Sequence, residues 1–113
     1  MRRDVDYVAD IANAVRRVAA YVRGIGREGF GEQPIVQDAV IRQLLIIGEA
    51  TKHLTKEFRA EHPDVPWREM AAMRDVLVHS YNRVDIDEVW QAATTDVANL
   101  ADRLEALLPP PPE

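Results

Sequence analysis

Apolar residues recur every three or four positions over most of the chain, which is the period of helices with one buried face. The pattern spans residues 4–22, 35–58 and 67–78, and a fourth stretch runs from Asp85 to Leu107. No stretch alternates with period two, so no strand is expected. Four helices with short connections predict an all-α fold, an antiparallel four-helix up-and-down bundle.

The stretch over residues 35–58 is apolar on more than one side. One stripe includes Val40 and Leu44, whereas Ile41 and Leu45 lie on another side. Two explanations are open, namely a central helix surrounded by its own chain, or a helix whose second apolar face contacts another subunit. The central helix is favoured, with a homodimer as the close alternative.

Glycine and proline mark the breaks between these stretches. Four of the five glycines lie within residues 24–31, and since glycine is costly inside a helix, a connecting loop is expected there. Pro66 is well placed to precede the third helix, because proline fits the first turn of a helix. Asp85, with Glu88 three residues later, resembles a capping box that begins the fourth helix.

Length and composition restrict the class of protein. A chain of 113 residues suffices for one core, so we expect a single domain over residues 1–108 and an extended proline-rich tail over residues 109–113. The absence of cysteine excludes disulfides, thiol nucleophiles and cysteine-ligated metals. No apolar run approaches the roughly 18 residues that span a membrane, and the acidic amino end does not resemble a signal peptide. We therefore expect a cytoplasmic protein with no cofactor.

The net charge of −5 comes from one end of the chain. Residues 83–113 contain seven acids and two bases, whereas residues 1–82 contain twelve of each. Twelve of the fourteen basic residues are arginine, a side chain that suits bidentate contacts with phosphate. The composition therefore neither supports nor excludes a nucleic-acid substrate.

Residues 74–81 place chemically useful side chains close together in the sequence. His79 can take or give a proton near neutral pH, and Arg74 can hold a phosphate and stabilise its charge during reaction. Together they suit RNA cleavage, in which the ribose 2′-hydroxyl attacks the adjacent phosphorus and neither a metal nor a protein nucleophile is required. The structural alternative is that Arg74 pairs with an acid and His79 interacts with the carboxyl end of its helix.

Helix geometry constrains how this pair works, because residues five apart on a helix point about 140° away from each other. Either the helix ends before His79 and the chain turns back, or a twofold axis brings two copies of Arg74 and His79 into one composite cleft. We expect both to contribute.

Other polar residues are weaker candidates. Glu49 and His53, four apart on the second helix, could ligate a metal, but no further ligands follow at suitable spacing, and a surface pair is expected. Asp38, Arg42 and Glu49 place polar groups along one side of that helix. An internal salt bridge and support for Arg74 or a dimer contact are equally favoured interpretations. The two tryptophans are expected to pack in the core.

The sequence resembles the HepT-type toxins of the HEPN superfamily. Their signature is arginine, a polar residue, three further residues and histidine, often followed by one residue and tyrosine, and Arg74, Asp75, His79 and Tyr81 match it. The resemblance extends over nearly the whole chain, in residues 36–42, 46–50, 62–67 and 84–90.

The resemblance implies a HEPN-like fold and a metal-independent endoribonuclease that is the toxin of a toxin–antitoxin system, with its active site at a homodimer interface. Arg74 and His79 would be the catalytic pair, and Asp75, where asparagine is more usual, the orienting residue. Tyr81 would receive AMP from a nucleotidyltransferase antitoxin, which adds bulk and negative charge where RNA enters. Two alternatives are a non-catalytic helical partner of a nucleotidyltransferase and a purely structural helical dimer.

Overall fold

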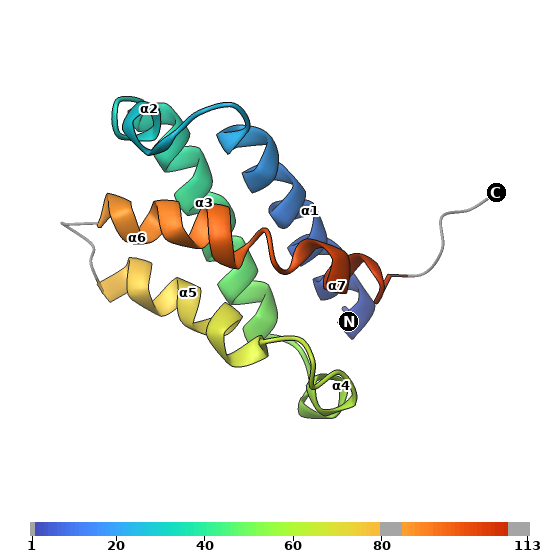
Figure 1. Cartoon of the computed structure of the whole chain (residues 1–113). Coiled ribbons are helices and arrows are strands. Elements are labelled where there is room, and N and C mark those ends of the chain that lie inside the picture. Colours follow the sequence, from blue (N-terminus) through green and yellow to red (C-terminus); the bar gives the residue numbers. More distant parts are fainter. Residues whose placement is uncertain (1, 80–84, 109–113) are drawn as a thin grey trace.

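A computed structural model of the chain describes residues 2–79 and 85–108, and for residues 75–79 it describes the backbone alone (Figure 1). The described residues form helices and no strand, which confirms the all-α class. The elements are α1 (Asp4–Val22), α2 (Arg27–Gly31), α3 (Pro34–Lys52), α4 (Lys56–Glu61), α5 (Trp67–His79), α6 (Ile86–Gln91), the π-helical turn η1 (Ala92–Asp96) and α7 (Ala101–Glu105).

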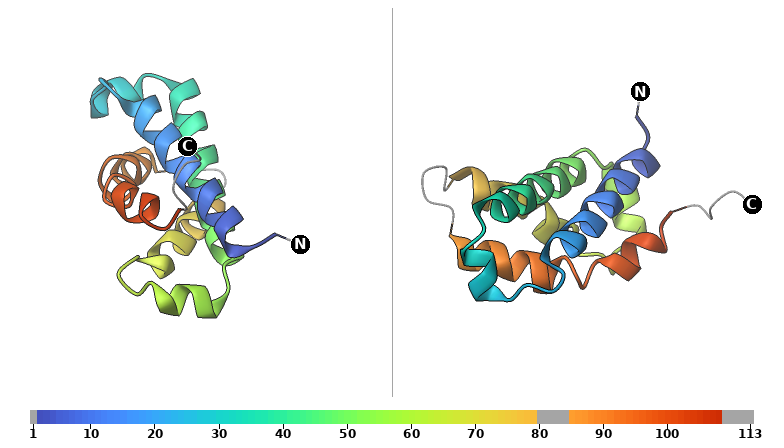
Figure 2. Two further views of the ribbon diagram at one scale, coloured as in Figure 1. Left: turned by 90° about the vertical axis from the view of Figure 1, so that its right-hand side faces the viewer. Right: turned by 90° about the horizontal axis from the view of Figure 1, so that it is seen from above.

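The central helix is α3. It packs against α1 on one side and α5 on another, and it also contacts α2 and α6. Seen from above, α6 and α7 lie along one side of the pair formed by α1 and α3 (Figure 2). The interpretation of α3 as a helix covered largely by its own chain is therefore confirmed, although one stripe of it faces outward.

Most of the core consists of positions that the helical period selects, and Phe30, from the stretch predicted as a loop, is an exception. The bounds of α1 agree with the predicted residues 4–22. Fully buried large side chains come from α1, α2, α3, α5 and the segment from α6 to α7; they include Val8, Ile11, Val18, Phe30, Val40, Leu44, Ile47, Met70, Val89, Val97 and Leu104. Trp67 is buried and Trp90 packs against this core, as predicted.

The glycine-rich stretch differs from the predicted loop, because residues 27–31 form α2. Phe30 is fully buried there, and its ring centroid lies 5.1 Å from that of Trp90 in α6. Burial of a whole aromatic side chain offsets the cost of two glycines in a short helix. Gly24, with φ of 77°, makes the turn that leaves α1.

The predicted helix over residues 35–58 is also wrong in its length, because the chain breaks after Lys52 and a new helix, α4, begins at Lys56. Thr55 caps α4, and its Oγ1 accepts a hydrogen bond from Phe58 N at 3.1 Å. Asp4 of α1 accepts hydrogen bonds from both Thr55 N, at 2.9 Å, and Thr55 Oγ1, at 2.8 Å. A cap with a tertiary partner thus redirects the chain.

The predicted last helix is interrupted between α6 and α7. Val97 N donates to Ala92 O at 2.8 Å, five residues back, so η1 holds one more residue than an α-helical turn. Thr94 Oγ1 donates to Trp90 O at 2.7 Å within the same region. Residues 2–79 and 85–108 therefore contain three long helices and a fourth, divided segment in place of four continuous helices.

Candidate active site

Arg74 lies where α5 comes very close to α3. A Cβ atom built on Gly48 of α3 would lie 2.6 Å from Arg74 Cβ and 2.8 Å from Arg74 N. Side chains essentially never approach backbone so closely, so this position accepts glycine alone. Gly48 therefore determines where the backbone of Arg74 sits on the surface of α3.

The residue after Gly48 contacts the arginine side chain. Glu49 Oε2 lies 2.7 Å from Arg74 Nε, and the two side chains are 53% and 40% exposed. An ion pair so open to water contributes only about 0.2–1 kcal/mol to stability. Its main effect is on orientation, because a carboxylate on Nε restricts the plane of the guanidinium group.

The same carboxylate also lies close to a histidine. Glu49 Oε1 is 3.5 Å from His53 Nε2, one turn further along α3. The His53 ring stacks on Tyr7 of α1, with centroids 5.2 Å apart and the planes 10° apart. The guanidinium group of Arg2 lies over the Tyr7 ring, with its Cζ 4.7 Å from the ring centroid. Side chains from α1, α3 and α5 thus meet around Glu49.

The expected surface pair of Glu49 and His53 is confirmed, since both side chains are more than half exposed. Among the described residues, no three His, Asp or Glu side chains gather as metal ligands. Asp38 and Arg42 are exposed on the outer stripe of α3, and neither forms an ion pair with a described residue. Glu49, the third member of the stripe, forms its ion pair with Arg74, which agrees with the interpretation that this stripe supports Arg74.

The backbone of α5 continues through His79. The helix does not end before His79, so the expectation that the chain turns back there is wrong. On a continuous helix, Arg74 and His79 project about 140° apart. The predicted roles of the Asp75 and His79 side chains, and of Tyr81, concern groups outside those that the structure describes.

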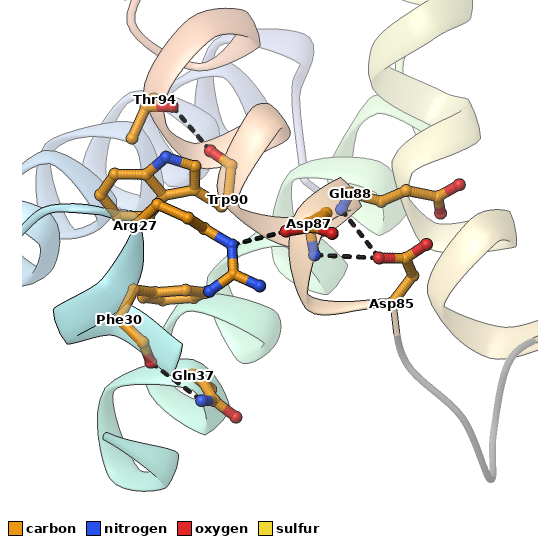
Figure 3. A network of polar contacts seen from close by, with 8 residues as sticks. All are labelled: Arg27, Phe30, Gln37, Asp85, Asp87, Glu88, Trp90 and Thr94. Carbon is orange, nitrogen blue, oxygen red and sulfur yellow. Dashed lines mark hydrogen bonds and ion pairs between the residues drawn. The ribbon is translucent and has the colours of Figure 1, made fainter. Parts of the chain in front are cut away.

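The beginning of α6 is fixed by several contacts shown in Figure 3. Asp85 Oδ1 accepts hydrogen bonds from Asp87 N at 2.9 Å and Glu88 N at 3.3 Å, which confirms Asp85 as the predicted cap. Arg27 of α2 runs toward α6, where its Nε lies 2.6 Å from Asp87 Oδ1 (Figure 3). Figure 1 shows this end of α6 and the last turn of α5 at the same side of the molecule. Residues 80–84, which include Tyr81, connect α5 to α6 and lie outside the described residues.

Sequence reasoning missed the contribution of Gly48 and the stack of Tyr7 on His53. A glycine inside an apolar helical stretch was the available signal, because such a glycine often marks close packing against another backbone. The stack left no signal, since its two members lie far apart in the sequence.

The family can now be assigned. The sequence model described as "Ribonuclease HepT-like" matches residues 11–107. The chain belongs to the HepT-like ribonuclease family. It is 42% identical over 106 residues to a probable ribonuclease HepT of Thermococcus cleftensis, which covers 94% of this chain and 96% of the relative. It is 36% identical over 108 residues to a candidate RNase of Caldanaerobacter subterraneus, which covers 96% of each. No solved structure shows a significant match.

Membership of the HepT-like family confirms the predicted resemblance and the predicted enzyme class, ribonuclease. Within the described part of the chain, no helix is long and apolar enough to cross a membrane.

Proposed function

We propose that this HepT-like protein is the toxin of a toxin–antitoxin pair and cleaves RNA without a metal ion, with Arg74 and His79 as its catalytic residues. The observation that carries the proposal is the position of Arg74, whose backbone lies against Gly48 and whose guanidinium contacts Glu49 at 2.7 Å. An arginine held on two sides at a partly exposed position suits recognition of a phosphodiester.

The reaction follows from the chemistry of these two side chains. A neutral His79 imidazole takes the proton of a ribose 2′-hydroxyl, and the resulting oxygen attacks the adjacent phosphorus. The bond from phosphorus to the 5′-oxygen breaks, that oxygen takes up a proton, and a 2′,3′-cyclic phosphate remains. Arg74 stabilises the negative charge that builds up on the phosphoryl oxygens. Asp75, beside Arg74 in the sequence, has the role of an orienting residue.

A homodimer is part of the proposal. Because α5 is helical through His79, one chain directs Arg74 and His79 to different sides, and a second copy supplies the missing partner. The outer stripe of α3 supports this arrangement: Ile35 is 85% exposed, and Leu45 is partly exposed outside the core cluster. Asp38 and Arg42 on the same stripe have the role of dimer contacts that support the cleft.

Regulation occurs at Tyr81, two residues after His79. A nucleotidyltransferase antitoxin transfers AMP from ATP to the Tyr81 hydroxyl: the tyrosine oxygen bonds to the α-phosphorus, and pyrophosphate leaves. The adenylate adds a bulky anion close to the catalytic histidine, and this blocks the approach of RNA phosphate. The alternative function is a non-catalytic helical partner of a nucleotidyltransferase, in which Tyr81 serves only in docking.

The test compares cells expressing the parent chain with cells expressing Arg74→Ala or His79→Ala at matched soluble levels. Growth arrest by the parent and rescue by each variant are expected, since each removes one catalytic group. The purified parent should cut an RNA oligonucleotide in excess EDTA and leave its all-deoxy counterpart intact. Arg17→Ala, an exposed cation of α1, is the matched control and should arrest growth as the parent does. Normal growth with the parent chain would favour the non-catalytic alternative.

A further inference from the structure

A hollow of about 530 Å³ lies between α4 and the first half of α5. Its lining residues are Lys56, Arg59, Trp67, Arg68, Ala71 and Ala72. Three of these six carry a positive charge and none carries a negative charge. We refer to this site as the α4–α5 hollow. It lies outside the cluster of side chains around Glu49 and has no part in the chemistry described above.

The positive charges of the α4–α5 hollow lack counter-charges. Lys56, Arg59 and Arg68 form no ion pair and no side-chain hydrogen bond with any described residue. Arg59 Nε is buried and has no acceptor. A buried charged donor without a partner is unfavourable, and native proteins usually satisfy such groups with an ion, a water molecule or a ligand. An anion in the hollow would reduce the repulsion among the three cations.

Trp67 forms one wall of the hollow and is held by contacts on two sides. The Trp67 side chain is 6% exposed, and its Nε1 donates to His62 O at 2.9 Å. Its ring also lies against Phe58 of α4, with centroids 5.9 Å apart. The two alanines of α5 leave space that larger side chains would fill. A preformed space binds a ligand without first having to be ordered.

The hollow lies on a particular side of α5. Arg68, Ala72, Asp75 and His79 follow one another at spacings of four, three and four, which places the four positions on one face of the helix. Arg68 and His79 are about 16 Å apart along the helix axis. An extended polynucleotide that reaches His79 can therefore follow this face of α5 to the hollow within a few nucleotides.

A neighbouring side of α5, which shares Ala72 with the hollow, has the opposite charge. A groove of about 860 Å³ lies between α5 and the segment from α6 to α7. Its charged lining residues are Glu69, Asp85, Asp87, Glu88, Asp96 and Arg103. Five carboxylates against one arginine repel a polyanion, so the two sides of α5 direct a phosphate chain toward the α4–α5 hollow.

We propose that the α4–α5 hollow binds a backbone phosphate of the RNA strand, a few nucleotides from the bond that is cleaved. The inference rests on the proposed ribonuclease function for the identity of the polymer, and on the unpaired cations for the site itself. Arg59 and Arg68 donate N–H groups to the phosphoryl oxygens, and Lys56 supplies a third charge.

The test is binding of a 2′-O-methyl RNA oligonucleotide, which cannot be cleaved, measured by fluorescence anisotropy at several salt concentrations. Arg68→Gln, at an exposed position, should weaken binding by about three- to tenfold at low salt and reduce the salt slope by about 0.7 for the lost phosphate contact. Arg59→Gln should act in the same direction. Arg17→Gln on α1 is the matched control and should leave both the affinity and the slope unchanged. Circular dichroism verifies that each variant is folded.

The outcomes separate this inference from the proposed function. Loss of binding in the hollow variants, with binding kept in Arg17→Gln, supports the hollow even if the parent chain cuts no RNA, a result that would refute only the nuclease. Equal affinity and equal salt slope for the parent and folded Arg68→Gln and Arg59→Gln would overturn the inference, even if the parent cleaves RNA. Equal weakening by Arg17→Gln would also overturn it, because the effect would then be one of net charge.

Discussion

Glu49 joins α3 to α5, because its Oε2 lies 2.7 Å from Arg74 Nε. Its Oε1 lies 3.5 Å from Nε2 of His53, whose ring stacks on Tyr7 of α1. The sequence pattern suggested Asp75, the neighbour of Arg74, as the orienting acid. The side chain of Asp75 lies outside those that the structure describes, so its role stays a prediction. The structure shows that an acid from another helix, Glu49, contacts the guanidinium, as one interpretation of the polar stripe on the second predicted helix expected. The ion pair between Glu49 and Arg74 is too exposed to contribute much to stability, so we expect its main effect to be on the cleavage rate.

Glu49→Ala should separate binding from catalysis. Removing a carboxylate beside Arg74 makes the site less negative, so affinity for uncleavable RNA should be unchanged or higher. The rate of single-turnover cleavage should fall by about ten- to a hundredfold, because the guanidinium loses its orientation. Glu28→Ala, an exposed acid of α2, should alter neither quantity. A cleavage rate equal to that of the parent would show that Glu49 does not position Arg74.

At the scale of elements, the long helices and the breaks marked by glycine and proline were predictable, whereas the break after Lys52 and the interruption after α6 were not. The period of apolar residues is a local property, and it gave α1 its bounds and the last segment its buried residues. The break between α3 and α4 depends on Thr55 and its contact with Asp4, which lies 51 residues earlier. The π-helical turn after α6 could not be predicted for a different reason. The spacing of apolar residues remains regular through the extra residue, so the sequence pattern does not show it.

The close contact of α3 with α5 depends on Gly48, which has no side chain. Gly48→Ala places a methyl group 2.6 Å from Arg74 Cβ, so the helices must separate, at a cost of about 1–3 kcal/mol in the free energy of unfolding. RNA cleavage should decrease as well, because Arg74 moves with α5. Urea denaturation and a cleavage assay measure the two effects.

Gly29→Ala is the control for this substitution. It lies in α2, and its new methyl group would meet Ile25 Cβ at 3.7 Å, an ordinary contact. Because alanine favours helix more than glycine does, the stability should rise by up to about 1 kcal/mol. If Gly48→Ala left the stability unchanged, or raised it as Gly29→Ala should, the close approach would not constrain α5.

For the whole molecule, the net charge of −5 conceals two oppositely charged surfaces on one helix. The acids in the C-terminal part of the sequence were visible in the composition, but the basic side was not. Lys56 and Arg59 approach Arg68 only because the chain turns after α3, and a continuous helix over residues 35–58 would have carried them elsewhere. The hollow could therefore not be predicted from the sequence, because the break after α3 was not predicted.

A composite cleft predicts complementation between two inactive variants. When Arg74→Ala and His79→Ala chains are mixed and allowed to exchange subunits, a mixed dimer contains one intact pair made of Arg74 from one copy and His79 from the other. Cleavage should return to about a quarter of the parent rate if half of the dimers are mixed and half of their sites are intact. A mixture that remains as inactive as its components would place the catalytic pair within one chain.

The hydrogen bonds from Thr55 to Asp4 also have a practical consequence for handling the protein. The fourth residue of the chain holds the start of α4, and α4 supplies two of the cations of the hollow. Trimming the amino end, or fusing a folded tag directly to it, therefore acts on a surface more than fifty residues away in the sequence. Purification tags belong at the carboxyl end of the chain, or behind a long linker that leaves Asp4 in place.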